Sequence, residues 1–317
     1  MKRPRVAVPF DAVVGVSVNS EFELVVKDTP GPKKELDISL CSCPSGSSGN
    51  ADGAIRNLGG HSSLVGLVEV NYDKEEETLE SLLLKRVVKQ SGVSFTPVPV
   101  LSKTNIAAIP IIKGSNGQVW GKKGEIIHSE VSQALQILSG PEVGIGPKTF
   151  VVITGLRAVE LPFAKALLSQ AQKGYSVLNA KESFCKSREF KKILPLVDLL
   201  VLNQREFFST GMCFSEIYDC GPTHMVMTDS DKGGMLYFGR GYYEKFAPVK
   251  FPNNNYETGA GDWFLGALVS ELIRRKISTE TMTLNKFRNV VAFAARVAGK
   301  KITMTGGGNG PSRHQLR

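Results

Sequence analysis

The chain reads NYETGAGDWFLGALV over residues 255–269. Three small residues precede the acid Asp262, and an apolar run follows it. Glycine has no Cβ, so its backbone adopts left-handed angles readily and lets a ligand approach closely. We therefore expect a loop that turns sharply into a helix. The first amides of that helix are unpaired and form a site for an anion.

The position of Asp262 at this anion site predicts a chemical role. A carboxylate beside a bound anion is unfavourable unless it takes part in chemistry or a cation neutralises it. Phosphoryl transfer resolves the conflict, because Asp262 takes a proton from a substrate hydroxyl. The amides of Gly259, Ala260 and Gly261 then hold the charge on the transferred group. A plain tight turn capped by Asp262 remains the alternative.

Two other glycine-rich phosphate loops fit this stretch less well. A Walker A loop requires Gly-Lys-Ser/Thr, and no such tripeptide follows Asp262. A dinucleotide-binding fingerprint lies after an early strand and has a third glycine where this chain has Phe264.

Composition indicates an ordinary globular protein. The chain has 317 residues, of which 42% are hydrophobic and 22% are charged, enough for one large domain. No run of about 18 apolar residues predicts a membrane span, and the first residues lack a signal-peptide pattern. Five scattered cysteines favour free thiols in a reducing compartment, so we expect a cytoplasmic protein. The net charge of +9 would attract an anionic substrate, and no nucleic-acid-binding motif is present.

The predicted elements change character near residue 150. Before it, short stretches alternate apolar and polar residues, which is typical of strands with one wet face: residues 22–26, 36–40, 95–101 and 105–112. After it, strands and helices alternate: strands over 150–154, 176–179, 199–202 and 225–228, and helices over 161–172, 262–274 and 284–298. This alternation predicts an α/β fold, a doubly wound and mainly parallel sheet with helices on both faces.

The N-terminal half completes this single domain, which we take to span residues 1–317. Residues 12–19 are expected to form the first buried strand. A small-residue loop over 45–50 opens a helix over 51–58, and a second, amphipathic helix is predicted over 75–90. We assign the alternating segments, residues 21–42 and 95–122, to a small β-sheet lid.

With these stretches in place, the chain resembles the PfkB, or ribokinase-like, family of carbohydrate and nucleoside kinases. The run from Thr258 to Asp262, followed by Phe264, is similar to the family's C-terminal signature. The resemblance implies that Asp262 is the catalytic base, that residues 259–261 form the anion hole and that Thr258 lies at the nucleotide.

A second match lies at the end of the strand predicted over 199–202. Asn203 and Glu206 look like the family's Asn-x-x-Glu, whose side chains manage the ATP phosphates and magnesium through ordered water. Mg²⁺ prefers oxygen ligands and keeps several of its waters, which agrees with that role for Glu206. A helix cap with an acid in the first turn is the common alternative.

Weaker matches surround the expected ATP site. Thr228 and Gly233 lie where the family has a Thr-x-Gly-x-x-Gly turn, although Ser230 replaces the middle glycine. Asn289 begins a stretch, residues 289–299, that resembles the helix walling the adenine pocket. A tightly packed core helix is an equal alternative for that stretch.

The substrate motifs resemble the family less closely. Gly46 and Asn50 match its Gly-Gly-x-x-x-Asn loop, with Ser45 at the first glycine position, and Asn50 would bond substrate hydroxyls. Glu21 stands where an aspartate usually binds the sugar. Lys103 resembles an arginine that meets a substrate phosphate in the phosphosugar branch, with a solvated lid lysine as the alternative.

The two residues before the signature differ from those of the family, and this difference affects whether a monovalent cation binds beside the loop. Tyr256 and Glu257 replace the more usual Asp followed by Thr or Pro. We predict an ATP-dependent kinase of a sugar hydroxyl that uses Mg²⁺, with a monovalent cation as a further expected cofactor. The lid would close over the substrate and could join two chains in a homodimer. A nucleoside kinase and a catalytically silent regulatory protein of the same fold are the alternatives.

Overall fold

A computed structural model describes most of the chain. The described residues are 11–16, 19–26, 38–71, 76–77, 89, 92–100, 106–112, 120–122, 131–138, 140, 143–171, 175–252, 257–304 and 308–316. Lys103, Tyr256 and most of the helix predicted over 75–90 lie outside them. Where that helix was expected to begin, Glu76–Glu77 instead form a short strand, β5, paired with β4.

Ten strands of the described chain form one sheet, in the order β14-β13-β12-β11-β10-β9-β1-β4-β5, with β6 also paired to β4. The strands are β1 (Ala12–Val16), β4 (Ser62–Asn71), β5, β6 (Ser94–Val100), β9 (Phe150–Leu156), β10 (Ser176–Ala180), β11 (Leu199–Asn203), β12 (His224–Thr228), β13 (Gly234–Phe238) and β14 (Tyr242–Phe246). Strands β6, β4, β1, β9, β10, β11 and β12 run parallel, whereas β13 and β14 form an antiparallel edge that the sequence did not predict.

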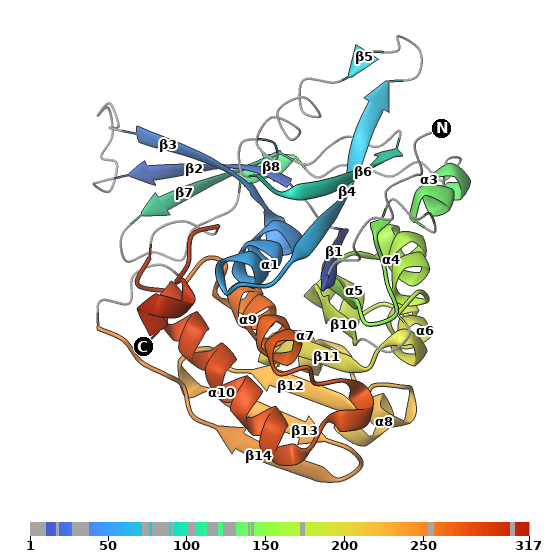
Figure 1. Cartoon of the computed structure of the whole chain (residues 1–317), viewed down its shortest axis with the longest axis vertical. Coiled ribbons are helices and arrows are strands. Elements are labelled where there is room, and N and C mark those ends of the chain that lie inside the picture. Colours follow the sequence, from blue (N-terminus) through green and yellow to red (C-terminus); the bar gives the residue numbers. More distant parts are fainter. Residues whose placement is uncertain are drawn as a thin grey trace, which may run out of the picture.

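Helices cover both faces of this sheet (Figure 1). They are α1 (Gly46–Asn57), α3 (Val131–Leu138), α4 (Leu161–Leu168), α5 (Glu182–Cys185), α6 (Glu189–Ile193), α7 (Gln204–Ser209), α8 (Phe214–Asp219), α9 (Ala260–Arg274) and α10 (Leu284–Lys301). Short 3₁₀ helices are η3 (Ala158–Glu160), η4 (Leu194–Leu196), η5 (Ser230–Lys232), η6 (Thr279–Thr281) and η7 (Arg313–Leu316).

Successive side chains of the central strands enter two different cores, as the period of two in a strand requires. Val152 packs into the core beneath α1, α9 and α10, while its neighbours Val151 and Ile153 pack into the core of the opposite face. The doubly wound α/β fold expected from the sequence is confirmed.

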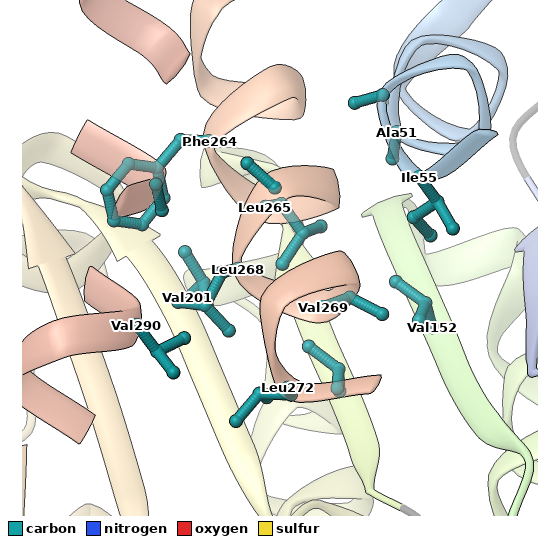
Figure 2. Packing of buried hydrophobic residues seen from close by; sticks show 14 of the residues in the cluster. Ala51, Ile55, Val152, Val201, Phe264, Leu265, Leu268, Val269, Leu272 and Val290 are labelled. Carbon is teal, nitrogen blue, oxygen red and sulfur yellow. The ribbon is translucent and has the colours of Figure 1, made fainter. Parts of the chain in front are cut away.

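Helix α9 lies at the centre of the first of these cores. Figure 2 shows its apolar side chains between α1, α10 and the sheet, with Val269 near Ile55 and Val152. Gly266 sets the distance between α9 and α1, because a Cβ there would lie 2.4 Å from the Ala51 carbonyl oxygen and 2.6 Å from the Ala54 Cβ. No larger residue permits this approach, so Gly266 brings the N-termini of the two helices together.

Four strands of the described chain form a second sheet, in the order β3-β2-β7-β8: β2 (Asn19–Val26), β3 (Ile38–Ser45), β7 (Ile106–Ile112) and β8 (Trp120–Lys122). It contains much of the segments assigned to the lid. The assignment of residues 95–100 to that lid is wrong, because β6 extends the main sheet through parallel pairing with β4. A strand at the edge of the main sheet carries the same alternating pattern as a lid strand.

The second sheet leads directly into α1. Strand β3 ends at Ser45 and α1 begins at Gly46, five residues before its predicted start at Ala51. Gly46 has φ 75°, a left-handed angle that suits glycine at this sharp transition. Residues 46–50 are therefore the first turns of a helix and not a loop. None of the described helices is long and apolar enough to cross a membrane.

Candidate active site

Several of the expected functional residues, among them Asn203 and Thr228, lie where parallel strands end. Strands β9, β10, β11 and β12 all present their carboxyl ends to the N-termini of α1, α7 and α9. In open parallel sheets this edge is the usual location of a ligand site, because side chains and helix N-termini converge there.

The N-terminus of α9 is formed by the glycine-rich stretch. Gly259 is its N-cap residue and has φ 81°, so left-handed geometry is required at this position. Gly261 does not have a positive φ, and no heavy atom outside its immediate surroundings lies within 4 Å of a Cβ built there. The expectation of left-handed angles therefore holds for Gly259 alone, and Gly261 borders open space.

The backbone amides at this helix end are only partly available to an anion. The Ala260 N–H donates to the Glu257 carbonyl at 3.1 Å, so it closes the preceding turn. Within the described residues, the amides of Gly259 and Gly261 have no backbone acceptor. The three-amide site expected at residues 259–261 thus reduces to Gly259 and Gly261 in this conformation, supported by the positive end of the α9 dipole.

Asp262 contacts helix α1. Asn50 Nδ2 donates to Asp262 Oδ2 at 3.0 Å, and the Ser47 hydroxyl lies close enough to this carboxylate to lower its pKa. Burial raises the pKa of Asp262 above its ordinary value of 3.8, while the positive charge of Lys181 and the bond from Asn50 oppose that shift. A carboxylate with a raised pKa is a stronger proton acceptor, which suits a general base.

Asn203 and Glu206 cap the N-terminus of α7. Asn203 Oδ1 accepts the Glu206 N–H at 2.9 Å, and Glu206 Oε2 accepts the Asn203 N–H at 2.8 Å. The helix cap weighed as the alternative is therefore present. This cap does not exclude a second role for Glu206. Burial raises the pKa of Glu206, and the charges of Lys181 and Asp262 lie close enough to affect it as well.

Glu206 can receive a divalent cation. Each carboxylate oxygen has more than one lone pair, and its neighbour Asp262 carries a like charge that a cation would neutralise. No group of three His, Cys, Asp or Glu side chains in the described chain forms a complete metal site. The donor set therefore fits a magnesium ion that keeps most of its waters and not a metal held in a protein cage.

Two polar residues of the site were missed from the sequence, and both belong to the end of β10. Asn179 Nδ2 donates to the Val201 carbonyl at 2.9 Å and to Glu206 Oε2 at 3.5 Å, which joins β10 to α7. Lys181 Nζ donates to Ser47 Oγ at 3.1 Å. Asn179 is the next-to-last residue of the buried parallel strand β10 and Lys181 directly follows the strand, a position that could have identified both.

The residues expected at ATP lie along the neighbouring strand ends. Thr228 ends β12 and is in register with Asn203 at the end of β11. Gly233 has φ 86°, and a Cβ there would lie 2.1 Å from the Phe246 carbonyl oxygen, so glycine is required. Ser230 also has a left-handed φ, 44°. Asn289 is exposed on α10, and Thr258 is half-buried in the turn before α9.

The remaining substrate residues are placed only in part. Gly46 is buried at the start of α1, next to Asn50 in the same helix. Glu21 lies in β2 opposite Cys43 and Ala107, and its side chain is outside the described residues. Lys103 is also outside them.

A buried cation lies near Asp262. Lys301 is fully buried, and its Nζ donates to the Met304 carbonyl at 3.2 Å. Its positive charge contributes to holding down the pKa of Asp262.

Comparisons with known proteins were made on sequence and on structure. No protein-family model and no curated protein matches the sequence. Solved structures do match. The ribokinase from Giardia lamblia has a TM-score of 0.71 at 18% identity, covering 96% of this chain and 97% of that one. Escherichia coli phosphofructokinase-2 in complex with potassium has a TM-score of 0.71 at 14% identity, covering 98% and 97%.

A nucleoside kinase from Methanocaldococcus jannaschii, an archaeal member of the ribokinase family, has a TM-score of 0.66 at 16% identity and covers 98% of both chains. The structure therefore has the ribokinase-like fold over nearly its full length. The resemblance drawn from the motifs is confirmed at the level of the fold.

Proposed function

We propose that this protein is an ATP-dependent kinase of the ribokinase-like family that phosphorylates a hydroxyl of a sugar or sugar-like molecule. The observation that carries this proposal is the contact between Asn50 and Asp262. It joins the expected substrate-binding residue to the expected base, at a helix N-terminus suited to a phosphate.

Asp262 would act as the general base. It would take the proton of the acceptor hydroxyl as that oxygen attacks the terminal phosphorus of ATP. Asn50 would orient both partners, because its Nδ2 holds the carboxylate while its buried Oδ1 has no hydrogen-bond partner among the described residues. A substrate hydroxyl would satisfy that oxygen, since a buried acceptor without a partner is costly.

The amides at the start of α9 would receive the negative charge. Gly259 and Gly261 contribute amide groups and the open space that a phosphoryl group needs. Charge that develops on the transferred group interacts favourably with these preorganised dipoles. Thr228, Gly233, Thr258 and Asn289 would contact the rest of the nucleotide.

Magnesium would be held on the nucleotide side of the site, by Glu206 through water and with Asn203 close by. The ion would neutralise phosphate charge when bound. The second sheet, with Glu21 and Lys103 as the proposed contacts of the substrate, would cover the acceptor and exclude water. We also propose this sheet as the surface of a homodimer.

A nucleoside remains a second candidate acceptor, because one structural neighbour is a nucleoside kinase and the reacting group is again a hydroxyl. The test measures ADP release from MgATP in the presence of each of five acceptors: ribose, fructose, fructose 6-phosphate, pseudouridine and adenosine. We expect one class of acceptor to raise ADP formation well above the acceptor-free rate. Absence of both transfer and ATP binding would contradict the proposal, whereas ATP binding without transfer to any acceptor would favour a regulatory protein.

A further inference from the structure

Lys181 occupies the boundary between the two halves of the proposed active site. It follows β10, which lies between β11 on the side of Asn203 and β9 on the side of α1. Asn203 and Thr228, which we propose for the nucleotide, end β11 and β12, whereas Gly46 and Asn50, which we propose for the acceptor, belong to α1. A group that passes from nucleotide to acceptor must cross in front of the end of β10.

We propose that Lys181 is a catalytic residue whose ammonium group binds the phosphoryl group during its transfer. The inference rests on the proposed kinase function. In the step, the acceptor oxygen forms a bond to the terminal phosphorus while the bond from that phosphorus to the bridging oxygen of ADP breaks. The hydroxyl proton goes to Asp262, and Lys181 remains protonated throughout.

The contacts of Lys181 place its ammonium beside the base. Lys181 Nζ donates to Ser47 Oγ at 3.1 Å, and the Ser47 hydroxyl lies close enough to the Asp262 carboxylate to lower its pKa. Gly155, at φ 68°, makes room for this arrangement. A Cβ there would lie 2.8 Å from Ser47 Oγ and 3.4 Å from Lys181 Cε. The ammonium is thus one side chain away from the carboxylate that would receive the proton.

Lys181 lies near two carboxylates, but neither forms an ion pair with its ammonium group. Its positive charge lowers the pKa of both Asp262 and Glu206. Among the described residues, however, no carboxylate lies within 4.0 Å of its Nζ, which donates to the neutral hydroxyl of Ser47. The ammonium therefore keeps donors for an anion, and its exposed side chain can follow that anion as it moves.

The charge of the transferred group explains why a cation is needed at this point. The amides of Gly259 and Gly261 reach it from the α9 end only, and Asp262 and Glu206 both add negative charge nearby. Lysine provides a compact positive charge that strengthens bonds to phosphate oxygens. We expect Lys181 to distinguish a nucleotide with a third phosphate from one without it.

The test compares wild type with Lys181→Met and Lys181→Arg. Calorimetry measures the dissociation constants of ADP and of the non-hydrolysable ATP analogue AMP-PNP, each with Mg²⁺. Lys186→Met is the matched control, because Lys186 is an exposed lysine at the C-cap of neighbouring α5 that pairs with Glu182 at 2.6 Å. Both Met variants remove one surface charge, and circular dichroism checks their folding.

We expect Lys181→Met to weaken AMP-PNP binding about tenfold or more and ADP binding less than about twofold, since a lost charge-assisted bond has this size. Turnover should fall about a hundredfold, Lys181→Arg should recover part of both losses, and Lys186→Met should resemble wild type. If Lys181→Met keeps both the wild-type ratio of ADP to AMP-PNP affinity and the wild-type turnover, the proposed role of Lys181 is overturned, while the kinase function is not. Failure of wild type to bind either nucleotide would instead reject the kinase function, and this role with it.

Discussion

Asn50 Nδ2 lies 3.0 Å from Asp262 Oδ2, although 212 positions separate the two residues in the chain. The contact depends on two helix N-termini that meet at the carboxyl edge of the sheet. The close approach of α1 to α9 at Gly266 makes that meeting possible. The acid is consequently held in one orientation before any ligand arrives.

Replacement of Asn50 tests this arrangement. Asn50→Ala should lower kcat/KM about 10- to 100-fold, because the carboxylate loses a charge-assisted hydrogen bond and the acceptor hydroxyl loses its partner. Steady-state kinetics with the best acceptor of the panel measures the effect. Asn57→Ala is the control, since Asn57 lies at the exposed end of the same helix and bonds the Gly310 carbonyl at 3.4 Å. Equal activities of the two variants would count against the role of Asn50.

Gly266→Ala should destabilise the protein by about 1–3 kcal/mol and lower activity, because the added methyl group forces α1 and α9 apart. Urea denaturation measures the free energy of unfolding. Gly53→Ala on α1 is the control: its Cβ would approach no described atom outside its own surroundings closer than 3.8 Å. An alanine there should be neutral or stabilising, because alanine favours helix. Similar losses in both variants would refute the packing argument.

Ser230→Gly should stabilise the turn between β12 and β13 by about 0.5–1 kcal/mol. Serine at φ 44° pays the steric penalty of a left-handed angle, and this penalty exceeds the entropy that glycine adds to the unfolded chain. Ser215→Gly in α8 provides the opposite control, because glycine lowers stability inside a helix. A loss of thermal stability in Ser230→Gly would contradict the assigned strain.

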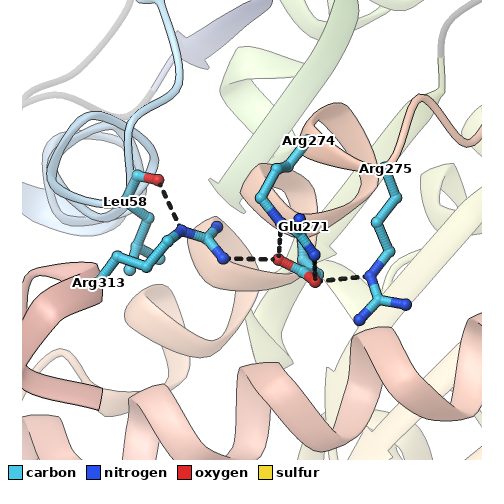
Figure 3. Close-up of polar contacts among 5 residues, drawn as sticks. All are labelled: Leu58, Glu271, Arg274, Arg275 and Arg313. Carbon is cyan, nitrogen blue, oxygen red and sulfur yellow. Dashed lines mark hydrogen bonds and ion pairs between the residues drawn. The ribbon is translucent and has the colours of Figure 1, made fainter. Parts of the chain in front are cut away.

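A buried carboxylate connects α9 to the end of the chain. Figure 3 shows Glu271 bonded by three arginines, and Arg313 also donates to the Leu58 carbonyl. Burial alone would raise the pKa of Glu271, but the bonds from Arg274, Arg275 and Arg313 outweigh it and lower the pKa to about 2. The ionised form is therefore stabilised by the fold.

Glu271→Gln should lower the free energy of unfolding at pH 7 by about 2–3 kcal/mol. A folded-state pKa below the unfolded value gives stability that is present above pH 4.5 and is lost as pH falls toward about 2. The difference between wild type and variant should shrink over that window. Glu189→Gln, which removes an exposed ion pair with Lys192, should change little. A difference that does not depend on pH would rule out this linkage.

Much of the fold and part of the site followed from the sequence. The parallel core was predictable because the spacing of apolar residues along the sequence differs between buried strands and amphipathic helices. Asp262 was predicted from the chemistry of an acid beside glycines, and Asn50 from the resemblance of its loop to the family's Gly-Gly-x-x-x-Asn motif; the structure brings the two into contact. Asn179 and Lys181 were missed, because the pattern does not say which strand ends become neighbours. The early start of α1 was missed because glycine and serine form helix poorly, and packing against α9 overrides that preference.

The lid was predicted less well than the core. Alternation of apolar and polar residues does not distinguish an edge strand of the main sheet from a lid strand. For this reason β6 was assigned to the wrong sheet. The cap formed by Asn203 and Glu206 shows a related ambiguity, because the pair satisfies the helix end while Glu206 also lies near Asp262.

Turnover of Asp262→Asn, with nucleotide affinity measured in parallel, tests the proposed base most directly. Because burial raises the pKa of Asp262, the ionised acid destabilises the empty fold: its stabilising contribution is present below pH 3.8 and is lost as pH rises through the raised value. Asp262→Asn should therefore unfold at a higher temperature than wild type at pH 7. We expect turnover to fall at least about a hundredfold, the low end for a general base, while MgATP still binds. Turnover equal to that of wild type would contradict this expectation.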